Sequence, residues 1–132
     1  MFRKIASLLL GAMIVATPAA AAKLTPEAEL TKALEGRVAG EAKRCIPLSR
    51  VQSSTIIEGV GILYRDGSKL YLNRPVSGAK SLDDWDILVT KTFGSQLCSR
   101  DVVHLVDPGS RMPSGFVFLG DFVPYTKPAK AK

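Results

Sequence analysis

The segment STIIEGVGILYRDGSKLYLNRP, residues 54–75, contains three short apolar runs separated by turn residues. The runs TII, GILY and KLYLN are joined by Glu58-Gly59 and by Asp66-Gly67. Asp-Gly between two alternating runs is a strong hairpin signal, because both central positions of the favoured turn take a positive φ. The segment therefore predicts two successive antiparallel hairpins.

A two-residue turn at Asp66-Gly67 also sets the register of the second hairpin, with Leu63 opposite Leu70. These two leucines would share one face of the strand pair. The other face would carry Ile62, Tyr64 and Tyr71. Apolar residues on both faces are typical of strands inside a sandwich or barrel rather than of an open sheet.

Three further stretches are expected to form strands. They are WDILVTKTF (85–93), DVVHLV (101–106) and GFVFLGDFVPY (115–125). The apolar runs are short, and no long helical pattern lies between them to form a parallel crossover. The expected fold is therefore mainly β, of the α+β class, with one N-terminal helix followed by a small antiparallel β-barrel or sandwich.

The N-terminal helix is expected over about residues 26–39. Thr25 is a good N-cap, and Pro26 takes the first helical position, where its missing N–H costs nothing. Apolar residues recur every four positions at Leu30, Leu34 and Val38. Gly36 or Gly40 would end the helix. We expect the helix to cover the sheet or its edge, and a partner-binding helix is the alternative.

Residues 1–22 have the layout of a secretory signal peptide. Two basic residues precede an apolar run over residues 5–15, and Ala20 and Ala22 satisfy the A-x-A cleavage rule. The run is shorter than the ~20 residues that span a bilayer, which favours cleavage near Ala22 over a retained membrane helix. The mature chain is then expected to be periplasmic or secreted.

The mature chain is expected to be one globular domain over residues 23–125, β-rich from residue 45, with a disordered basic tail over 126–132. The full chain has 18 basic and 12 acidic side chains, a net charge of +6, and two of the basic ones lie in the leader. Nucleic acid is not an expected partner after export, whereas anionic lipid head groups or acidic envelope polymers are. The candidates for surface binding are Lys127, Lys130 and Lys132. The alternative is that these lysines only keep the domain soluble.

The chain has two cysteines, Cys45 and Cys98. In an oxidising compartment they permit a single intramolecular disulfide, which we expect. Closing a loop of this length would stabilise the domain by about 4 kcal/mol on the chain-entropy estimate. One alternative is a reactive Cys98 thiol with His104, the only histidine, as its base, and another is intermolecular pairing.

Three carboxylates lie next to the only tryptophan, at Asp83, Asp84 and Asp86. Several oxygen ligands would suit a hard cation such as calcium, but the spacing matches no EF-hand. A loop of solvated charges is the favoured interpretation, and no metal or other cofactor is expected. Trp85 alternates with the apolar residues of the strand that follows, so it is expected to be a core or half-buried anchor.

No motif selects a catalytic group. The sequence has no Gly-x-Ser-x-Gly elbow, phosphate-binding loop or dinucleotide fingerprint. His104 stands between two apolar residues and is interpreted as a structural strand residue. Any two carboxylates could meet in the fold and act as acid and base, but nothing in the sequence selects a pair. No catalytic residue is therefore assigned.

Four stretches form a recognisable pattern: RCIPLSRVQSSTII, ILYRDGSKLYLNRP, FGSQLCSRD and FLGDFVPY. Its most specific parts are Cys-Ile-x-x-Ser from Cys45, Tyr-x-Asn from Tyr71, Ser-Gln-Leu-Cys ending at Cys98, and Leu-Gly-x-Phe from Leu119. Over most of residues 44–125 the chain resembles a family of small exported proteobacterial proteins of unknown function. The resemblance implies export and one compact domain, and it implies no activity. Relatives often carry further cysteines near the positions of Gly78 and Phe116, where this chain has none, which argues against a cysteine-dependent metal or redox role.

These observations favour a non-enzymatic exported envelope protein that acts as a binding or structural module, as a monomer or weak dimer. Its expected partner is an unknown envelope protein or an anionic envelope component, bound by an exposed patch on one sheet face. A periplasmic inhibitor of a hydrolase is an alternative, although the basic charge argues against a basic lysozyme as its target. A small carboxylate-dependent enzyme is the third hypothesis.

Overall fold

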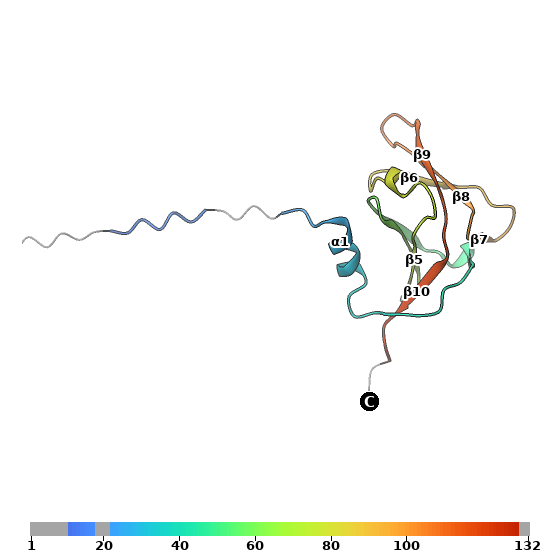
Figure 1. Cartoon of the computed structure of the whole chain (residues 1–132), viewed down its shortest axis with the longest axis horizontal. Helices are drawn as coiled ribbons and strands as arrows, with labels where there is room; N and C mark the ends of the chain where they lie inside the picture. The colour runs from blue at the N-terminus through green and yellow to red at the C-terminus, as the bar shows by residue number, and fades with distance from the viewer. Residues whose placement is uncertain (1–10, 18–21, 130–132) are drawn as a thin grey trace, which may run out of the picture.

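The computed structural model describes residues 11–17 and 22–129. Within these ranges the elements are, in chain order, α1 (Pro26–Ala33), β1 (Val38–Ala39), β2 (Cys45–Pro47), the 3-10 turn η1 (Leu48–Arg50), β3 (Ser53–Ile57), β4 (Gly61–Asp66), β5 (Lys69–Asn73), the 3-10 turn η2 (Ala79–Ser81), β6 (Ile87–Thr90), β7 (Gln96–Cys98), β8 (Val102–Val106), β9 (Pro113–Phe118) and β10 (Phe122–Thr126). Residues 11–17 have no helix or strand and extend away from the folded part (Figure 1).

The strands form antiparallel sheets in two layers. One layer is a five-stranded sheet in the order β1-β10-β5-β4-β3. The other contains the three-stranded sheet β6-β8-β9 and the two-stranded sheet β2-β7. Helix α1 lies beside the five-stranded sheet, on the side away from the second layer (Figure 1). The predicted mainly β, antiparallel fold is confirmed, and of the two expected architectures the sandwich fits.

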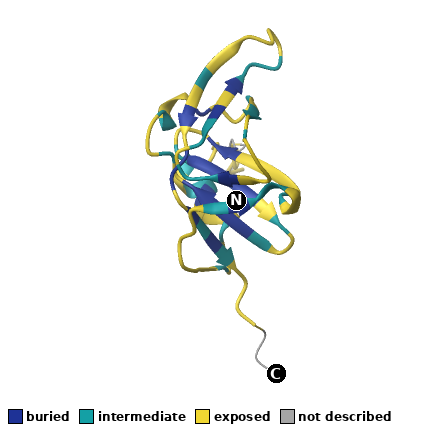
Figure 2. Ribbon diagram, turned by 90° about the vertical axis from the view of Figure 1, so that its right-hand side faces the viewer, coloured by how far each residue is buried: buried dark blue, intermediate teal, exposed yellow. Residues whose placement is uncertain are grey.

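The main core lies between the two layers. It consists of Ile46, Ile56, Ile62, Tyr64, Tyr71, Leu82, Leu97, Val103, Leu105, Val117, Leu119 and Phe122. A second cluster lies between the five-stranded sheet and α1, and consists of Leu30, Ile57, Leu63, Leu70 and Leu72. Figure 2 shows buried residues along the strands and exposed residues in the connecting loops. Both faces of the β4–β5 hairpin are therefore buried, as its sequence predicts, and α1 covers the sheet as expected.

The turn of the β4–β5 hairpin lies one residue later than predicted. Asp66 pairs with Lys69, so the central turn residues are Gly67 and Ser68. Gly67 has a φ of +60°, while neither Asp66 nor Ser68 has a positive φ. Glycine with positive φ at the first central position is typical of a type II′ turn, whereas the predicted turn would need positive φ at both.

This turn displaces the register by two residues, and Leu63 lies opposite Leu72 instead of Leu70. Because side chains alternate between the two faces of a strand, a displacement of two residues leaves each of them on its predicted face. Leu63 and Leu70 accordingly share the cluster under α1, while Tyr64 and Tyr71 lie in the main core.

Helix α1 is shorter than the predicted span of residues 26–39. It ends at Ala33, because Gly36 takes a left-handed φ of +74° and turns the chain back. The residues after this turn, Val38–Ala39, form β1 against β10 instead of a last helical turn. The start is as predicted, since the Thr25 hydroxyl accepts a hydrogen bond from the Ala28 N–H at 3.3 Å.

The stretch over residues 115–125, predicted as a single strand, forms parts of two strands in different layers. β9 ends at Phe118 and β10 begins at Phe122, so the chain crosses between layers in the three residues between them. Gly120 lies at this crossing, where an added Cβ would collide with the backbone carbonyl oxygen of Arg74. The crossing therefore requires glycine.

The predictions for the two ends of the chain lie partly outside the described residues. β10 includes Thr126, so the first residue of the predicted tail belongs to the sheet, and Lys127 is exposed beyond it. Lys130 and Lys132 lie outside the described residues, as does most of the predicted leader. In the part of the chain that the structure describes, no helix has the length and apolar character needed to cross a membrane.

Candidate functional site

The two cysteines form the predicted disulfide. Cys45 and Cys98 lie directly opposite each other in the β2–β7 pair, with an S–S distance of 2.08 Å. The backbone N–H of Cys98 also donates to the Asp101 carboxylate at 2.7 Å. Cys98 is therefore a structural residue, and the alternative of a thiol activated by His104 is wrong.

The three aspartates near the tryptophan do not form a cluster. Asp83 accepts a hydrogen bond from the Trp85 N–H at 3.0 Å, and Asp86 accepts one from the Ser114 hydroxyl at 2.6 Å. Asp84 is exposed. Among the described residues, no group of three His, Cys, Asp or Glu side chains is placed to hold a metal ion.

Trp85 is not a core residue, which corrects the prediction. Its side chain is 72% exposed. Strand β6 begins only at Ile87, and Trp85 lies in the preceding turn, so it does not share the alternation of the strand. A large aromatic side chain is left in solvent beside the acidic loop.

The outer face of the three-stranded sheet is apolar and faces solvent. Val103, Leu105 and Val117 point into the main core and are fully buried. Their neighbours in each strand therefore point outward, because side chains alternate between faces. We call this surface the apolar sheet face, and it consists of Ile87, Val89, Val102, His104, Val106, Phe116 and Phe118.

Aromatic rings occupy the centre of the apolar sheet face. Phe116 and Phe118 are 51% and 37% exposed, and their rings pack edge to face with centroids 5.7 Å apart. His104, exposed and directly opposite Phe116, lies with its ring centroid 6.4 Å from that phenylalanine. The face therefore offers aromatic contact area together with one group that can donate or accept a hydrogen bond.

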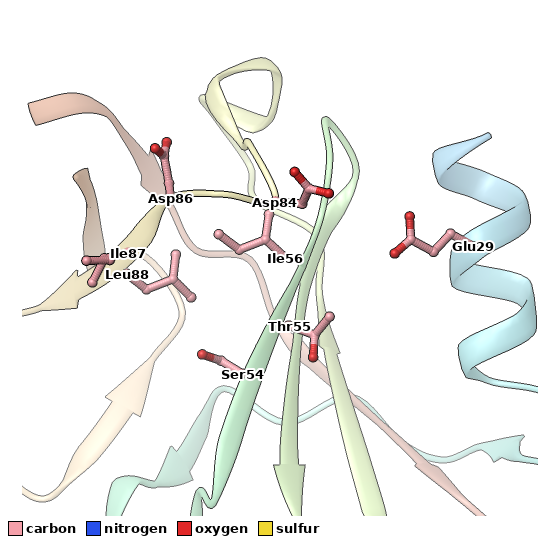
Figure 3. A pocket seen from close by; sticks show the side chains of 8 residues that line it. All are labelled: Glu29, Ser54, Thr55, Ile56, Asp84, Asp86, Ile87 and Leu88. Carbon is pink, nitrogen blue, oxygen red and sulfur yellow. The ribbon is translucent and has the colours of Figure 1, made fainter. Parts of the chain in front are cut away.

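A groove of about 550 Å³ lies between β3, β6 and α1 (Figure 3). Its lining residues are Glu29, Ser54, Thr55, Ile56, Asp84, Asp86, Ile87 and Leu88. Glu29 and Asp86 are half-buried, and Asp84 is exposed. The three carboxylates come from the helix and from the loop before β6, so acidic groups from distant parts of the sequence line the same groove.

Comparisons of the chain with protein-family models, with curated proteins and with solved structures gave no match. The resemblance to a family of exported proteins therefore stays a prediction.

The sequence pattern contained a signal for the apolar sheet face that strand prediction alone did not use. Residues 102–106 and 115–119 are apolar at nearly every position, whereas a strand with one buried face normally alternates apolar and polar residues. The groove had no such signal, because its walls come from three segments whose proximity depends on the tertiary fold.

Proposed function

We propose that this chain is a non-enzymatic exported module of the cell envelope that binds a protein partner through the apolar sheet face. The observation that carries the proposal is the pair Phe116 and Phe118, which remain solvent-exposed on the opposite side of the sheet from the fully buried Val103, Leu105 and Val117. Contiguous apolar surface of this kind marks interaction sites on proteins. Aromatic side chains are also enriched at the centres of protein interfaces, where they supply much of the binding energy.

Two further observations support export. The first 22 residues have the layout of a secretory leader. The Cys45–Cys98 disulfide is typical of a small domain in an oxidising compartment, because cytosolic thiols are kept reduced.

The proposal is tested by comparing partner capture by the wild-type protein and by a Phe116→Ser/Phe118→Ser variant, both expressed with the leader. Phe93→Ser is the matched control, because Phe93 is fully exposed in the loop after β6 and does not belong to the sheet face. The double variant should bind the purified partner at least ~10-fold more weakly, since truncating central aromatic residues costs an interface ~2 kcal/mol or more.

The control variant should bind like the wild type. Equal binding of the double variant and the wild type would contradict the proposal. A hydrolase recovered as the partner, and inhibited on binding, would assign the module to the inhibitor class.

A further inference from the structure

Among the residues that the structure describes, no strand pairs with the outer edge of β3, and this edge lacks the features that usually protect an edge strand. β3 ends the five-stranded sheet, and its sequence SSTII has neither a charged residue nor a proline. Its pairing with β4 is regular from Ser53 to Ile57, without a bulge. Edge strands are normally protected by charges, prolines or bulges, because a bare edge is a template for pairing with another strand.

The groove runs along this free edge. Ser54 and Ile56 point toward β6, while Thr55 points to the opposite side, toward α1 (Figure 3). Successive residues of a strand point to opposite faces of the sheet. A groove lined by all three residues must therefore extend past the outer edge of β3, from one face of the sheet to the other. An extended segment in the groove would therefore lie beside the β3 backbone.

The side walls of the groove carry negative charge. Glu29 extends from α1 on one side and Asp86 lies on the other, before β6, while Asp84 lies between them in this view (Figure 3). None of the eight lining residues is basic, although the whole chain has a net charge of +6. The groove is thus an acidic site on a basic protein.

We propose that this groove binds an extended, basic segment of a partner protein, which adds to the five-stranded sheet as a sixth strand beside β3. Main-chain hydrogen bonds to β3 would provide affinity, as in other cases of strand addition. Because the side chains of the added strand alternate, one set would face Glu29 and the other set Asp86, with Asp84 between them. If both sets of side chains in the added strand contain lysine or arginine, each wall of the groove places a carboxylate next to a basic side chain.

This site shares Ile87 with the border of the apolar sheet face, but its argument uses neither Phe116 nor Phe118 and does not depend on the function proposed for that face. Its occupant is identified by charge and by extended conformation. The test therefore uses defined peptides and needs no knowledge of the natural partner.

The experiment measures binding of fluorescent peptides to the oxidised domain by anisotropy. The main probe is an eight-residue peptide of valine and lysine in the order Val-Lys-Lys-Val-Val-Lys-Lys-Val, which places lysine in both alternating sets. A second peptide has glutamate in place of lysine. A third keeps the lysines but carries N-methyl groups at alternate backbone amides, so it has the same charge and cannot pair fully as a strand.

The lysine peptide should bind, and the glutamate and N-methylated peptides should bind at least ~10-fold more weakly. Glu29→Gln and Asp84→Asn should each weaken binding of the lysine peptide several-fold, while Asp121→Asn, which removes an exposed carboxylate that does not line the groove, should have no effect. Equal binding of the N-methylated peptide would overturn strand addition, and equal binding of the glutamate peptide would overturn the basic occupant. A peptide of residues 126–132, TKPAKAK, is also tested. If it binds more tightly than the lysine probe, the result would overturn a foreign partner and identify a second copy of this chain as the occupant.

Discussion

Asn73 and Gly120 exchange two hydrogen bonds in the interior of the domain. The Asn73 side-chain amide Nδ2 donates to the Gly120 carbonyl at 2.8 Å, and the Gly120 N–H donates to the Asn73 side-chain oxygen Oδ1 at 2.9 Å. Asn73 is fully buried at the end of β5. Its side-chain amide pairs with the Gly120 backbone as a neighbouring strand would. This pair fixes the segment in which the chain crosses from β9 to β10.

Asn73→Ala should lower the free energy of unfolding by about 2–4 kcal/mol, because it leaves both backbone groups of Gly120 buried without partners. Asn73→Asp should also destabilise, since a carboxylate can accept from the Gly120 N–H but cannot donate to its carbonyl. Urea denaturation measures both changes.

Gln52→Ala is the matched control for the buried amide. The Gln52 side chain also accepts a backbone hydrogen bond, from the Gly67 N–H at 3.1 Å, but it is exposed. Its loss should cost less than about 1 kcal/mol. If Asn73→Ala cost no more than Gln52→Ala, the buried pair would have no special structural role.

The disulfide should contribute stability and no chemistry. Cys98→Ser, or reduction of the wild type, should lower the unfolding free energy by roughly 2–4 kcal/mol, because the bond closes a loop between residues 53 apart in sequence. Partner binding at a temperature where the variant remains folded should be unchanged. Alkylation before and after reduction provides the direct check, since two thiols that react without reductant would show that the bond is absent.

Removal of the Tyr64 hydroxyl group is expected to stabilise the folded domain. Among the described residues, its oxygen is the one buried side-chain polar atom without a hydrogen-bond partner, and burial raises the pKa of the phenol well above its usual value. The ring itself packs against Phe122, with centroids 5.8 Å apart. Tyr64→Phe should therefore raise the free energy of unfolding by about 1 kcal/mol. A loss of similar size in thermal denaturation would show that the hydroxyl has a partner.

The stability that Asp107 contributes in the β8–β9 connection should depend on pH. The backbone N–H of Ser110 donates to its carboxylate at 2.6 Å and the Ser110 hydroxyl donates at 3.0 Å, and these bonds lower the pKa of Asp107. A lowered pKa in the folded state gives stability that is fully present above about pH 5 and is lost as the pH falls through the folded-state value.

The stability difference between the wild type and Asp107→Asn should accordingly be constant above about pH 5 and shrink below it. Chemical denaturation at a series of pH values measures this difference. A difference that grows on acidification would have the wrong sign for the proposed cause.

The hairpin in residues 61–73 shows how much of the fold its sequence determines. The apolar pattern predicts the correct face for the five residues to which it assigns one, even though the predicted turn lies one residue too early; they are Ile62, Leu63, Tyr64, Leu70 and Tyr71. The face depends only on whether the register shift is odd or even, whereas the register depends on which turn type the tertiary fold selects. The Arg50–Asp66 ion pair, at 3.2 Å, joins residues whose proximity the local sequence does not reveal.

The candidate sites were less predictable because they depend on the packing of distant elements. Alternation predicts Trp85 to be a core or half-buried anchor, but the strand starts two residues later and the side chain is exposed. The groove combines Glu29 of α1 with the loop before β6, and no local pattern joins these segments. By contrast, the single pair of cysteines left one possible intramolecular disulfide, which is why that prediction was confirmed.

Site-specific photo-crosslinking in the producing cell tests the central proposal most directly. A photoreactive phenylalanine analogue is placed at position 116 of the apolar sheet face, or at position 68 in the exposed β4–β5 turn as a control. We predict one reproducible protein adduct from position 116, absent from position 68 and lost when Phe118 is also replaced by serine. Adducts of equal yield from both positions, or none from position 116, would contradict the assignment of the apolar sheet face as the binding surface.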